Sequence, residues 1–251
     1  MPVLPGSGKL FDAPGLAALA DQLAPHAEVW TVAPQHERSA MSHSLTMHKP
    51  LRLQSRGERR FAVSGTPADC VYLGLHHLLP APPDLVVSGI NHGGNLGADV
   101  HYSGTVAGAR EACLHGVPAV AVSLYYLPAD QEMFWATAAV TTARVVKALA
   151  VRPLPPQVFL NVNVPNVPLE KLRGIRAARL GDRLYHPRVD ERIDPRGRPY
   201  VWIGGPHAAF GDAEDADGRL VVAGWATATP LSAVLTDEAA LSDLRSWTDP
   251  Q

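Results

Sequence analysis

Short apolar runs alternate with longer segments of helical periodicity along the first two thirds of the chain. Apolar runs bounded by turn residues are typical of buried strands, and apolar residues at every third or fourth position are typical of helices. The pattern predicts strands over residues 28–34, 83–90, 118–124 and 157–165, and helices over residues 14–26, 67–79, 104–116 and 130–150. This alternation predicts an α/β fold with a Rossmann-like, mostly parallel sheet and helices on both faces.

Two parts of the chain depart from this alternation. Residues 47–65 predict a hairpin with polar loops, inserted between the first strand and the second helix. After about residue 166 the helix-strand rhythm stops, and charged, proline-bearing loops separate short apolar runs. Antiparallel strands are predicted in these runs, at residues 174–180, 199–205 and 219–231.

The end of the chain predicts a short helix over residues 236–247, with Thr236 as its N-cap and acidic residues in its first turn. We therefore expect an α/β core domain over residues 1–165 and a C-terminal antiparallel β arm with a terminal helix over residues 166–251. Because such an arm is too extended to form a core alone, we expect it to contact a second copy of the chain.

Composition narrows the possible partners. A net charge of −2 and a pI near 6.6 disfavour a polymeric nucleic-acid partner. The two cysteines, Cys70 and Cys113, lie in apolar sequence and indicate neither a disulfide framework nor a zinc site. Neither a signal-peptide pattern nor a run of 18 apolar residues occurs, so we expect a cytoplasmic protein with no membrane partner.

The segment "PGSGKLFDAPG", residues 5–15, looks at first like a phosphate-binding loop. A Walker loop requires Ser or Thr after the lysine, where this chain has Leu10, and a first glycine where it has Val3. The segment also lacks the third glycine of a dinucleotide-binding G-x-G-x-x-G motif, which disfavours a Rossmann-type dinucleotide enzyme.

Candidate chemistry lies in the loops that follow the predicted strands, because ligands of open α/β sheets bind at the carboxyl ends of strands. Asn91 and Asn95 offer amide oxygens that a hard cation can bind. Ser103, Gly104 and Thr105 open a predicted helix, and the free amides of a helix N-terminus bind phosphate. Each residue alone is also a common turn or cap residue, but their joint placement favours a ligand site for Asn91 and the 103–105 turn.

Four further polar residues lie in or near these loops. Ser39 follows the first strand and would, by itself, be an ordinary surface serine. His43, His92 and His101 are candidate proton donors, and we expect at most one of them to act.

Four motifs, in this order, carry a resemblance to a known family: "VAPQHERSAMSHSLT", "VSGTPADCVYLGL", "PDLVVSGINHGGNLGADVHYSGTVAGAREA" and "PAVAVSL". They closely resemble the SurE family of survival proteins over residues 10–165, with weaker similarity to the end of the chain. The resemblance implies a divalent-metal-dependent nucleotidase that hydrolyses nucleoside 5′- or 3′-monophosphates. It also implies Mg²⁺ or Mn²⁺ as cofactor. From the extended arm we expect a homodimer or homotetramer.

The same resemblance assigns roles to individual residues. Ser39 and Asn91 take the positions of metal ligands at the catalytic centre, and Asn95 takes that of the family's second loop asparagine. Residues 102–105 match the family's Y-S-G-T phosphate-binding turn.

The chain departs from the family at its start. Where the family has N-D-D-G, this chain has Ser7, Gly8, Lys9 and Leu10, so both carboxylates are missing. A cation held only by neutral oxygens should bind weakly. Lys9 could instead take the place of the metal and bind the phosphate directly, which would make the chain a nucleotide-binding or structural pseudoenzyme. An altered N-terminal segment is a third explanation, because Pro5 and Gly6 suit a buried central strand poorly.

Overall fold

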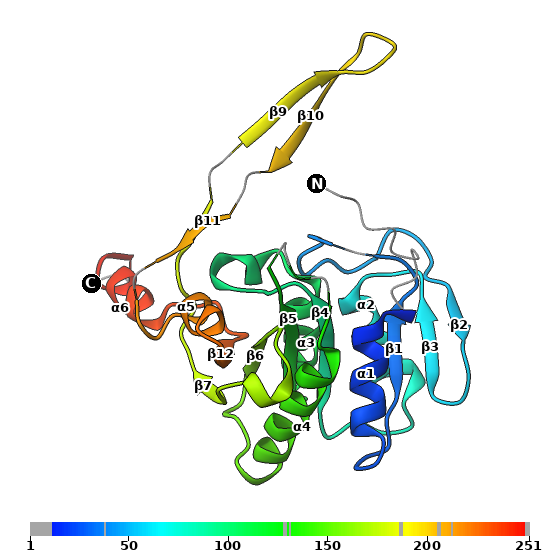
Figure 1. The fold of residues 1–251 in the computed structure, drawn as a ribbon. Coiled ribbons are helices and arrows are strands. Elements are labelled where there is room, and N and C mark those ends of the chain that lie inside the picture. Colours follow the sequence, from blue (N-terminus) through cyan, green and yellow to red (C-terminus); the bar gives the residue numbers. More distant parts are fainter. Residues whose placement is uncertain are drawn as a thin grey trace.

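The largest sheet has five strands in the order β4-β5-β6-β12-β7 (Figure 1). The computed structural model describes residues 12–37, 39–127, 130, 132–185, 188–204, 207–211 and 213–248. Strands β4 (Val86–His92), β5 (Ala119–Tyr125) and β6 (Val158–Pro165) are parallel, as the apolar runs predict. Strand β12 (Ala226–Ser232) is antiparallel to β6, and β7 (Ile175–Ala177) is parallel to β12.

A second sheet has three strands in the order β1-β3-β2. Strand β1 (Thr31–Pro34) is shorter than expected and lies parallel to β3 (Arg60–Val63). The predicted hairpin is confirmed, because β2 (Leu53–Ser55) is antiparallel to β3. Within the described residues, β1 and β4 each pair with a strand on one side only, so the strands form two sheets instead of one.

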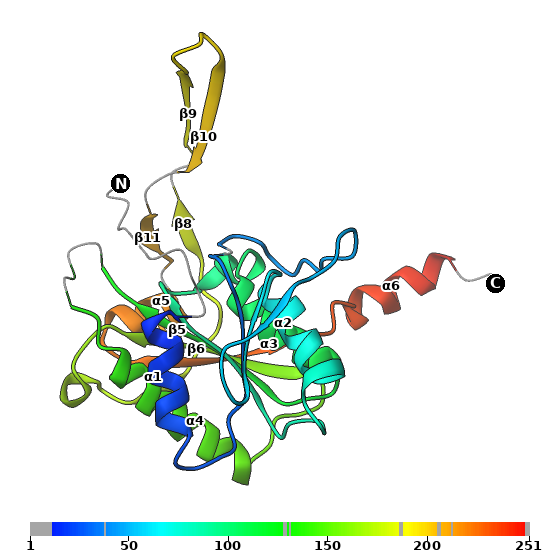
Figure 2. The same cartoon turned by 90° about the vertical axis from the view of Figure 1, so that its right-hand side faces the viewer.

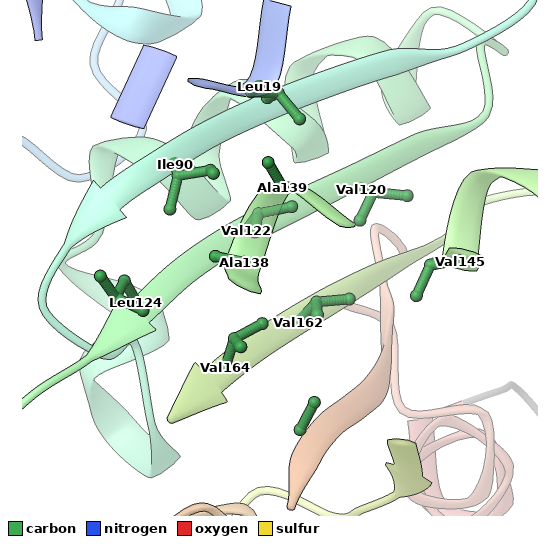
Figure 3. Close-up of a cluster of buried hydrophobic side chains, with 11 residues drawn as sticks. Leu19, Ile90, Val120, Val122, Leu124, Ala138, Ala139, Val145, Val162 and Val164 are labelled. Carbon is green, nitrogen blue, oxygen red and sulfur yellow. The ribbon is translucent and has the colours of Figure 1, made fainter. Parts of the chain in front are cut away.

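Helices cover both faces of the five-stranded sheet, as predicted. Figure 3 shows one core, in which α1 (Pro14–Leu23) and α4 (Trp135–Val151) meet the inward side chains of the parallel strands. On β5, Val120, Val122 and Leu124 belong to this core, whereas Ala119 and Ala121 face a second core with α3 (Gly104–Leu114). The helix α2 (Pro67–Leu73) packs against α3. The alternation along β5 follows from the two-residue repeat of a strand.

Local sequence signals explain where most helices begin and end. Pro14 and Pro67 lie in the first turns of α1 and α2, and Thr66 and Asp69 form a capping box. Gly116, with φ of +77°, follows the end of α3.

Two of the predicted helices differ most in extent from the observed ones. The segment predicted to extend α2 is a separate π-helical turn, η2 (Gly74–Leu78). Helix α4 begins at Trp135 because the side chain of Asn166 bonds to the backbone of Glu132 and Phe134, which holds the preceding residues outside the helix.

The central sheet crosses the boundary that we expected at residue 165, since β7 and β12 both follow it. Two strand predictions in this part were wrong. Residues 174–180 contribute β7, which is parallel to its neighbour and not antiparallel. The first four residues of the predicted strand at 219–231 belong to α5 (Asp217–Val222), which ends before Gly224 at φ of +87°. An apolar run of four residues fits either element, so its period could not distinguish them.

Strands β8 to β11 form an arm that projects away from the α/β body in Figures 1 and 2. The arm contains two antiparallel pairs, β9 (Arg188–Ile193) with β10 (Pro199–Gly204) and β8 (Arg183–Tyr185) with β11 (His207–Phe210). Short 3₁₀ turns occur at η3 (Gly97–His101) and η4 (Leu169–Lys171).

The terminal helix α6 (Glu238–Thr248) is confirmed, but its first turn is capped differently from the prediction. Asp237 Oδ1 accepts the amide of Ala240 at 2.9 Å, so Asp237 and not Thr236 acts as the cap. None of the helices in the described ranges combines the length and apolar character needed to cross a membrane.

Candidate functional site

The loops that follow β1 and β4 meet at one rim of the molecule. The amide of Ser42 donates to the carbonyl of Tyr102 at 3.0 Å, and its hydroxyl donates to the carbonyl of His101 at 2.7 Å. The loop of residues 35–46, which carries Ser39, therefore lies against the residues that directly precede the 103–105 turn. This agrees with the rule that carboxyl-end loops of parallel strands converge.

Asn91 lies near the end of β4 and is partly exposed. Its Nδ2 donates to the carbonyl of Gly93 at 2.8 Å, and within the described residues no donor reaches its Oδ1. Gly93 has φ of +112°, a conformation that few other residues adopt, and its amide bonds to Leu124 of β5. The turn thus fixes Asn91 while leaving its oxygen available to a ligand.

The 103–105 turn begins α3. Ser103 is the N-cap, and its hydroxyl accepts the amide of Val106 at 3.1 Å. The amides of Gly104 and Thr105 belong to the first turn of the helix, where intrahelical acceptors are absent. Gly104 is buried and Thr105 is half-buried. Two amides and the positive end of the helix dipole therefore make this turn suited to an anion.

Ser39 is exposed, and its hydroxyl donates to Glu37 Oε1 at 2.8 Å. The same serine is the residue that the family resemblance assigns to the metal. Glu37 was not predicted as a site residue, although it lies two positions from Ser39. It is an acidic side chain in contact with Ser39, one of the two neutral candidate ligands.

Asn95 differs from the other predicted residues because it is buried, with 7% of its surface exposed. Its Nδ2 donates to Ser123 Oγ at 2.6 Å, and its amide donates to Asn163 Oδ1 at 2.8 Å. Its carbonyl accepts Nδ2 of Asn161 at 2.8 Å and of Asn163 at 3.1 Å. Asn95 therefore holds its loop onto β5 and β6, beneath the rim.

A buried carboxylate lies next to these residues. Asp217 is fully buried and accepts the amides of Gly97, Gly181 and Gly218 at 2.9, 3.0 and 2.8 Å. We call Asn95, Ser123, Asn161, Asn163 and Asp217 the buried polar layer. Sequence reasoning missed Asp217, because it predicted a strand at residues 219–231 and left Asp217 in the charged loop before that strand.

The three candidate histidines have different surroundings. His43 Nε2 lies 2.6 Å from Oε2 of the buried Glu111. Because this nitrogen is already hydrogen-bonded, it is not free to donate a proton to a ligand. His92 stacks on Tyr126 with ring centroids 4.4 Å apart. Desolvation lowers the pKa of His92, and the negative charge of Glu37 opposes that shift. His101 is exposed, and its carbonyl accepts the hydroxyl of Ser42.

The described residues do not form a complete site for a divalent cation. Ser39 Oγ and Asn91 Oδ1 are neutral oxygens, and Mg²⁺ is usually bound through one or two carboxylates. In the part of the chain that the structure describes, no group of three or more His, Cys, Asp or Glu side chains could hold a metal ion. Lys9, the proposed phosphate ligand, lies outside the described residues, as does Gly8.

Comparison with known proteins identifies close relatives. A family model described as Survival protein SurE matches residues 10–187. The 5'-nucleotidase SurE of Geobacter metallireducens is 47% identical over 235 residues, which cover 94% of this chain and 92% of the relative. That of Rhodospirillum rubrum is 45% identical over 232 residues, covering 90% and 88% of the two chains.

A solved structure has the same fold. The crystal structure of the SurE protein from Aquifex aeolicus matches with a TM-score of 0.85 at 36% sequence identity. The match covers 96% of this chain and 97% of that chain, so it includes residues beyond the α/β core.

Proposed function

The chain belongs to the SurE family of survival proteins, and from this membership we propose that it is a nucleotidase. Its reaction would be hydrolysis of the phosphomonoester of a nucleoside 5′- or 3′-monophosphate. The observation that carries the proposal is the meeting of the Ser39 loop with the start of α3 through Ser42 and Tyr102. Two loops that resemble ligand-binding loops of a nucleotidase family are thereby joined at one rim.

The residues of the rim would act mainly by binding and orientation. The first-turn amides of α3 would accept phosphoryl oxygens, and the helix dipole would favour their negative charge. The amide oxygen of Asn91 and the hydroxyl of Ser39 would lie on the opposite side of the phosphate. Holding the phosphate in one orientation lowers the entropic part of the barrier to attack by water.

A divalent cation would supply positive charge for the phosphoryl group. We propose Ser39 and Asn91 as the residues that would contact it, with Mg²⁺ or Mn²⁺ as the candidates. Because both are neutral, we expect saturation only at millimolar Mn²⁺. Isothermal titration with MnCl₂ measures this affinity without any substrate, and tight binding that survives Asn91→Ala would contradict the assignment.

Release of inorganic phosphate from adenosine and guanosine monophosphate tests the function directly. The N-terminal sequence of the assayed protein is first confirmed by mass spectrometry, because the two missing carboxylates would lie there. We expect Mn²⁺-stimulated release that falls at least about a hundredfold in Asn91→Ala. Ser55→Ala, an exposed serine on β2, is the matched control for Ser39→Ala and should leave turnover unchanged.

The sequence at positions 8 and 9 favours a second candidate function, nucleotide binding without hydrolysis. Loss of a catalytic carboxylate lowers rates by orders of magnitude, and an ammonium group can hold a phosphate without a metal. This candidate predicts that nucleoside monophosphate binds in the presence of a chelator and that Lys9→Ala abolishes the binding. Turnover by the protein with a verified N-terminus would exclude it.

The exposed arm supports a further proposal, that two or four copies of the chain associate. Val201, Trp202 and Ile203 on β10 are 57%, 62% and 88% exposed, which is unusual for adjacent apolar side chains. Sedimentation equilibrium should give a dimer or tetramer, and Trp202→Glu with Ile203→Lys should shift it toward monomer. A location in the cytoplasm stays a prediction.

A further inference from the structure

The loop of residues 35–46 has a backbone that needs external support. Ala40 and Ser42 have φ angles of +55° and +52°, in the left-handed region that residues other than glycine rarely adopt. Such conformations persist only where the surrounding contacts fix them. Ser39 lies directly before this pair, so its position depends on those contacts.

Hydrogen bonds anchor both ends of the segment from Ser42 to Thr46. Ser42 bonds to the residues before α3, as described above. At the other end, Thr46 donates its amide and its hydroxyl to the two oxygens of Asp69, at 2.8 and 2.7 Å. The hydroxyl of Thr66 donates to the carbonyl of Ser44 at 2.7 Å. These bonds tie the end of the loop to the start of α2.

His43 provides a separate connection, directly to α3. Its Nε2 lies 2.6 Å from Oε2 of Glu111, and the Glu111 side chain is only 5% exposed. The second carboxylate oxygen, Oε1, lies 3.1 Å from Nε2 of His115. The two histidines thus approach one buried carboxylate through different oxygens.

The hydrogen bonds of this cluster follow from its geometry. An ionised carboxylate can only accept, so Nε2 of His43 and Nε2 of His115 both donate to Glu111. His76 Nε2 lies 3.2 Å from Nδ1 of His115. Each carboxylate oxygen of Glu111 therefore has a donor. Burial without those donors would be strongly unfavourable.

Glu111 and the 103–105 turn belong to the same helix. Glu111 lies about two turns beyond Gly104 along α3, and a helix of this length behaves as a rigid element. A contact that fixes the loop to Glu111 therefore also fixes the loop relative to the amides at the start of α3. The candidate phosphate site needs this relation, since Ser39 comes from the loop and the amides from the helix.

We propose that Glu111 is a positioning residue, which holds His43 and thereby sets the position of Ser39 relative to the first turn of α3. The expected effect on turnover rests on the proposed function, but the expected effect on the position of the loop does not. In this account His43 acts as a hydrogen-bond donor to Glu111 and not as a proton donor to substrate. Glu111 itself contacts no substrate atom.

The test compares four single variants and one double variant of the full chain. His43→Ala and Glu111→Ala both remove the contact, and Glu111→Ala also orphans His115. His43→Gln keeps an N–H donor near the position of Nε2 and should restore the contact. His115→Ala is the matched control, because it removes the other bond to the same carboxylate without touching the loop.

Amide hydrogen exchange of Ser42, whose amide bonds to Tyr102, reports on the loop whether or not the protein turns over. We expect exchange about tenfold faster or more in His43→Ala and Glu111→Ala, and within about threefold of the parent chain in His43→Gln and His115→Ala. In the double variant, His43→Ala with Glu111→Ala, the Ser42 amide should exchange no faster than in Glu111→Ala alone. Both substitutions remove the same His43–Glu111 contact, so their effects should not add.

Turnover supplies the second readout. If the parent chain releases phosphate, His43→Ala should lower kcat/KM about tenfold or more, and His43→Gln should recover most of it. If His43→Ala acted only by lowering the stability of the fold, His43→Gln would not restore turnover. Thermal melts followed by circular dichroism measure the stability of each variant. The proposal is overturned if His43→Ala leaves Ser42 exchange unchanged, or if His115→Ala changes it as much. A parent chain without turnover would contradict the proposed function while the exchange result still decides the role of Glu111.

Discussion

Asn91 near the end of β4 and Asn95 in the loop that follows are four residues apart, yet they belong to different regions of the molecule. Asn91 lies at the rim, partly exposed, with its amide oxygen available among the described residues. Asn95 lies in the buried polar layer, where its side chain and backbone bond to β5 and β6. An asparagine side chain is thus a candidate ligand at position 91, whereas at position 95 it stabilises the loop beneath that site.

The buried polar layer explains how the rim keeps its shape. Ser123 and Asn163 are register partners on neighbouring strands, and Asn163 in turn pairs with Thr227 of β12. This row of polar residues crosses three strands just below the carboxyl edge. It binds the backbone of the loop that leads to η3 and α3. The buried polar layer thus stabilises the fold, and the rim directly above it carries the candidate binding residues.

The largest expected effect comes from the buried layer. Asp217→Ala would remove the acceptor of three amides, two of them at the buried Gly97 and Gly218, so the free energy of unfolding should fall by about 3 kcal/mol or more. Asp215→Ala is the matched control, because its ion pair with Arg179 is exposed and should contribute less than about 1 kcal/mol. Urea unfolding measures both. Equal effects of the two variants would contradict a special role for the layer.

The asparagine pair gives a reciprocal prediction. Asn95→Ala removes a buried bond to Ser123, so we expect the free energy of unfolding to fall by about 2 kcal/mol. Asn91→Ala should cost less than about 1 kcal/mol and should instead lose nucleotide or metal binding. Urea unfolding and calorimetric titration of each variant give the two quantities. If Asn95→Ala lost binding while its free energy of unfolding stayed unchanged, the assignment of Asn95 to stability and Asn91 to binding would be contradicted.

The smallest expected effect concerns ionisation. Burial, reinforced by the charge of Asp69, raises the pKa of the Cys70 thiol above its ordinary value of 9.0. The folded state therefore holds this proton more tightly than the unfolded state, and stability should decline as the pH rises above about 9. Cys70→Ala removes this contribution, so its unfolding free energy should fall less steeply between pH 9 and about 11. If the free energies of unfolding of the parent chain and Cys70→Ala fell equally with pH, the raised pKa of Cys70 would be contradicted.

The sequence was sufficient to predict most of the α/β core. Apolar runs predicted β4, β5 and β6, because strands buried on both faces need continuous apolar residues. Proline and glycine signals predicted several helix ends. The antiparallel entry of β12 beside β6 could not be predicted, because nothing in a local pattern specifies which distant strand will be its neighbour.

The candidate site was less accessible to sequence reasoning. The carboxyl-edge rule selected the loops of Ser39, Asn91 and the 103–105 turn, and two bonds of Ser42 join the first and the last of these loops. The placement of the residues favoured Asn91 over Asn95 as a ligand, but it did not predict that Asn95 is buried, since burial is a property of the fold. Glu111 left a signal that was overlooked, because a buried acidic residue on a mostly apolar helix needs a partner.

The central claim is that the rim binds the phosphate of a nucleoside monophosphate through the first turn of α3. A titration of ¹⁵N-labelled protein with adenosine monophosphate, followed by the amide resonances of Gly104 and Thr105, tests it most directly. The account predicts that these two amides show large, saturable shifts, which disappear in Asn91→Ala or are much reduced. Shifts confined to other parts of the molecule, or none at millimolar nucleotide, would contradict it.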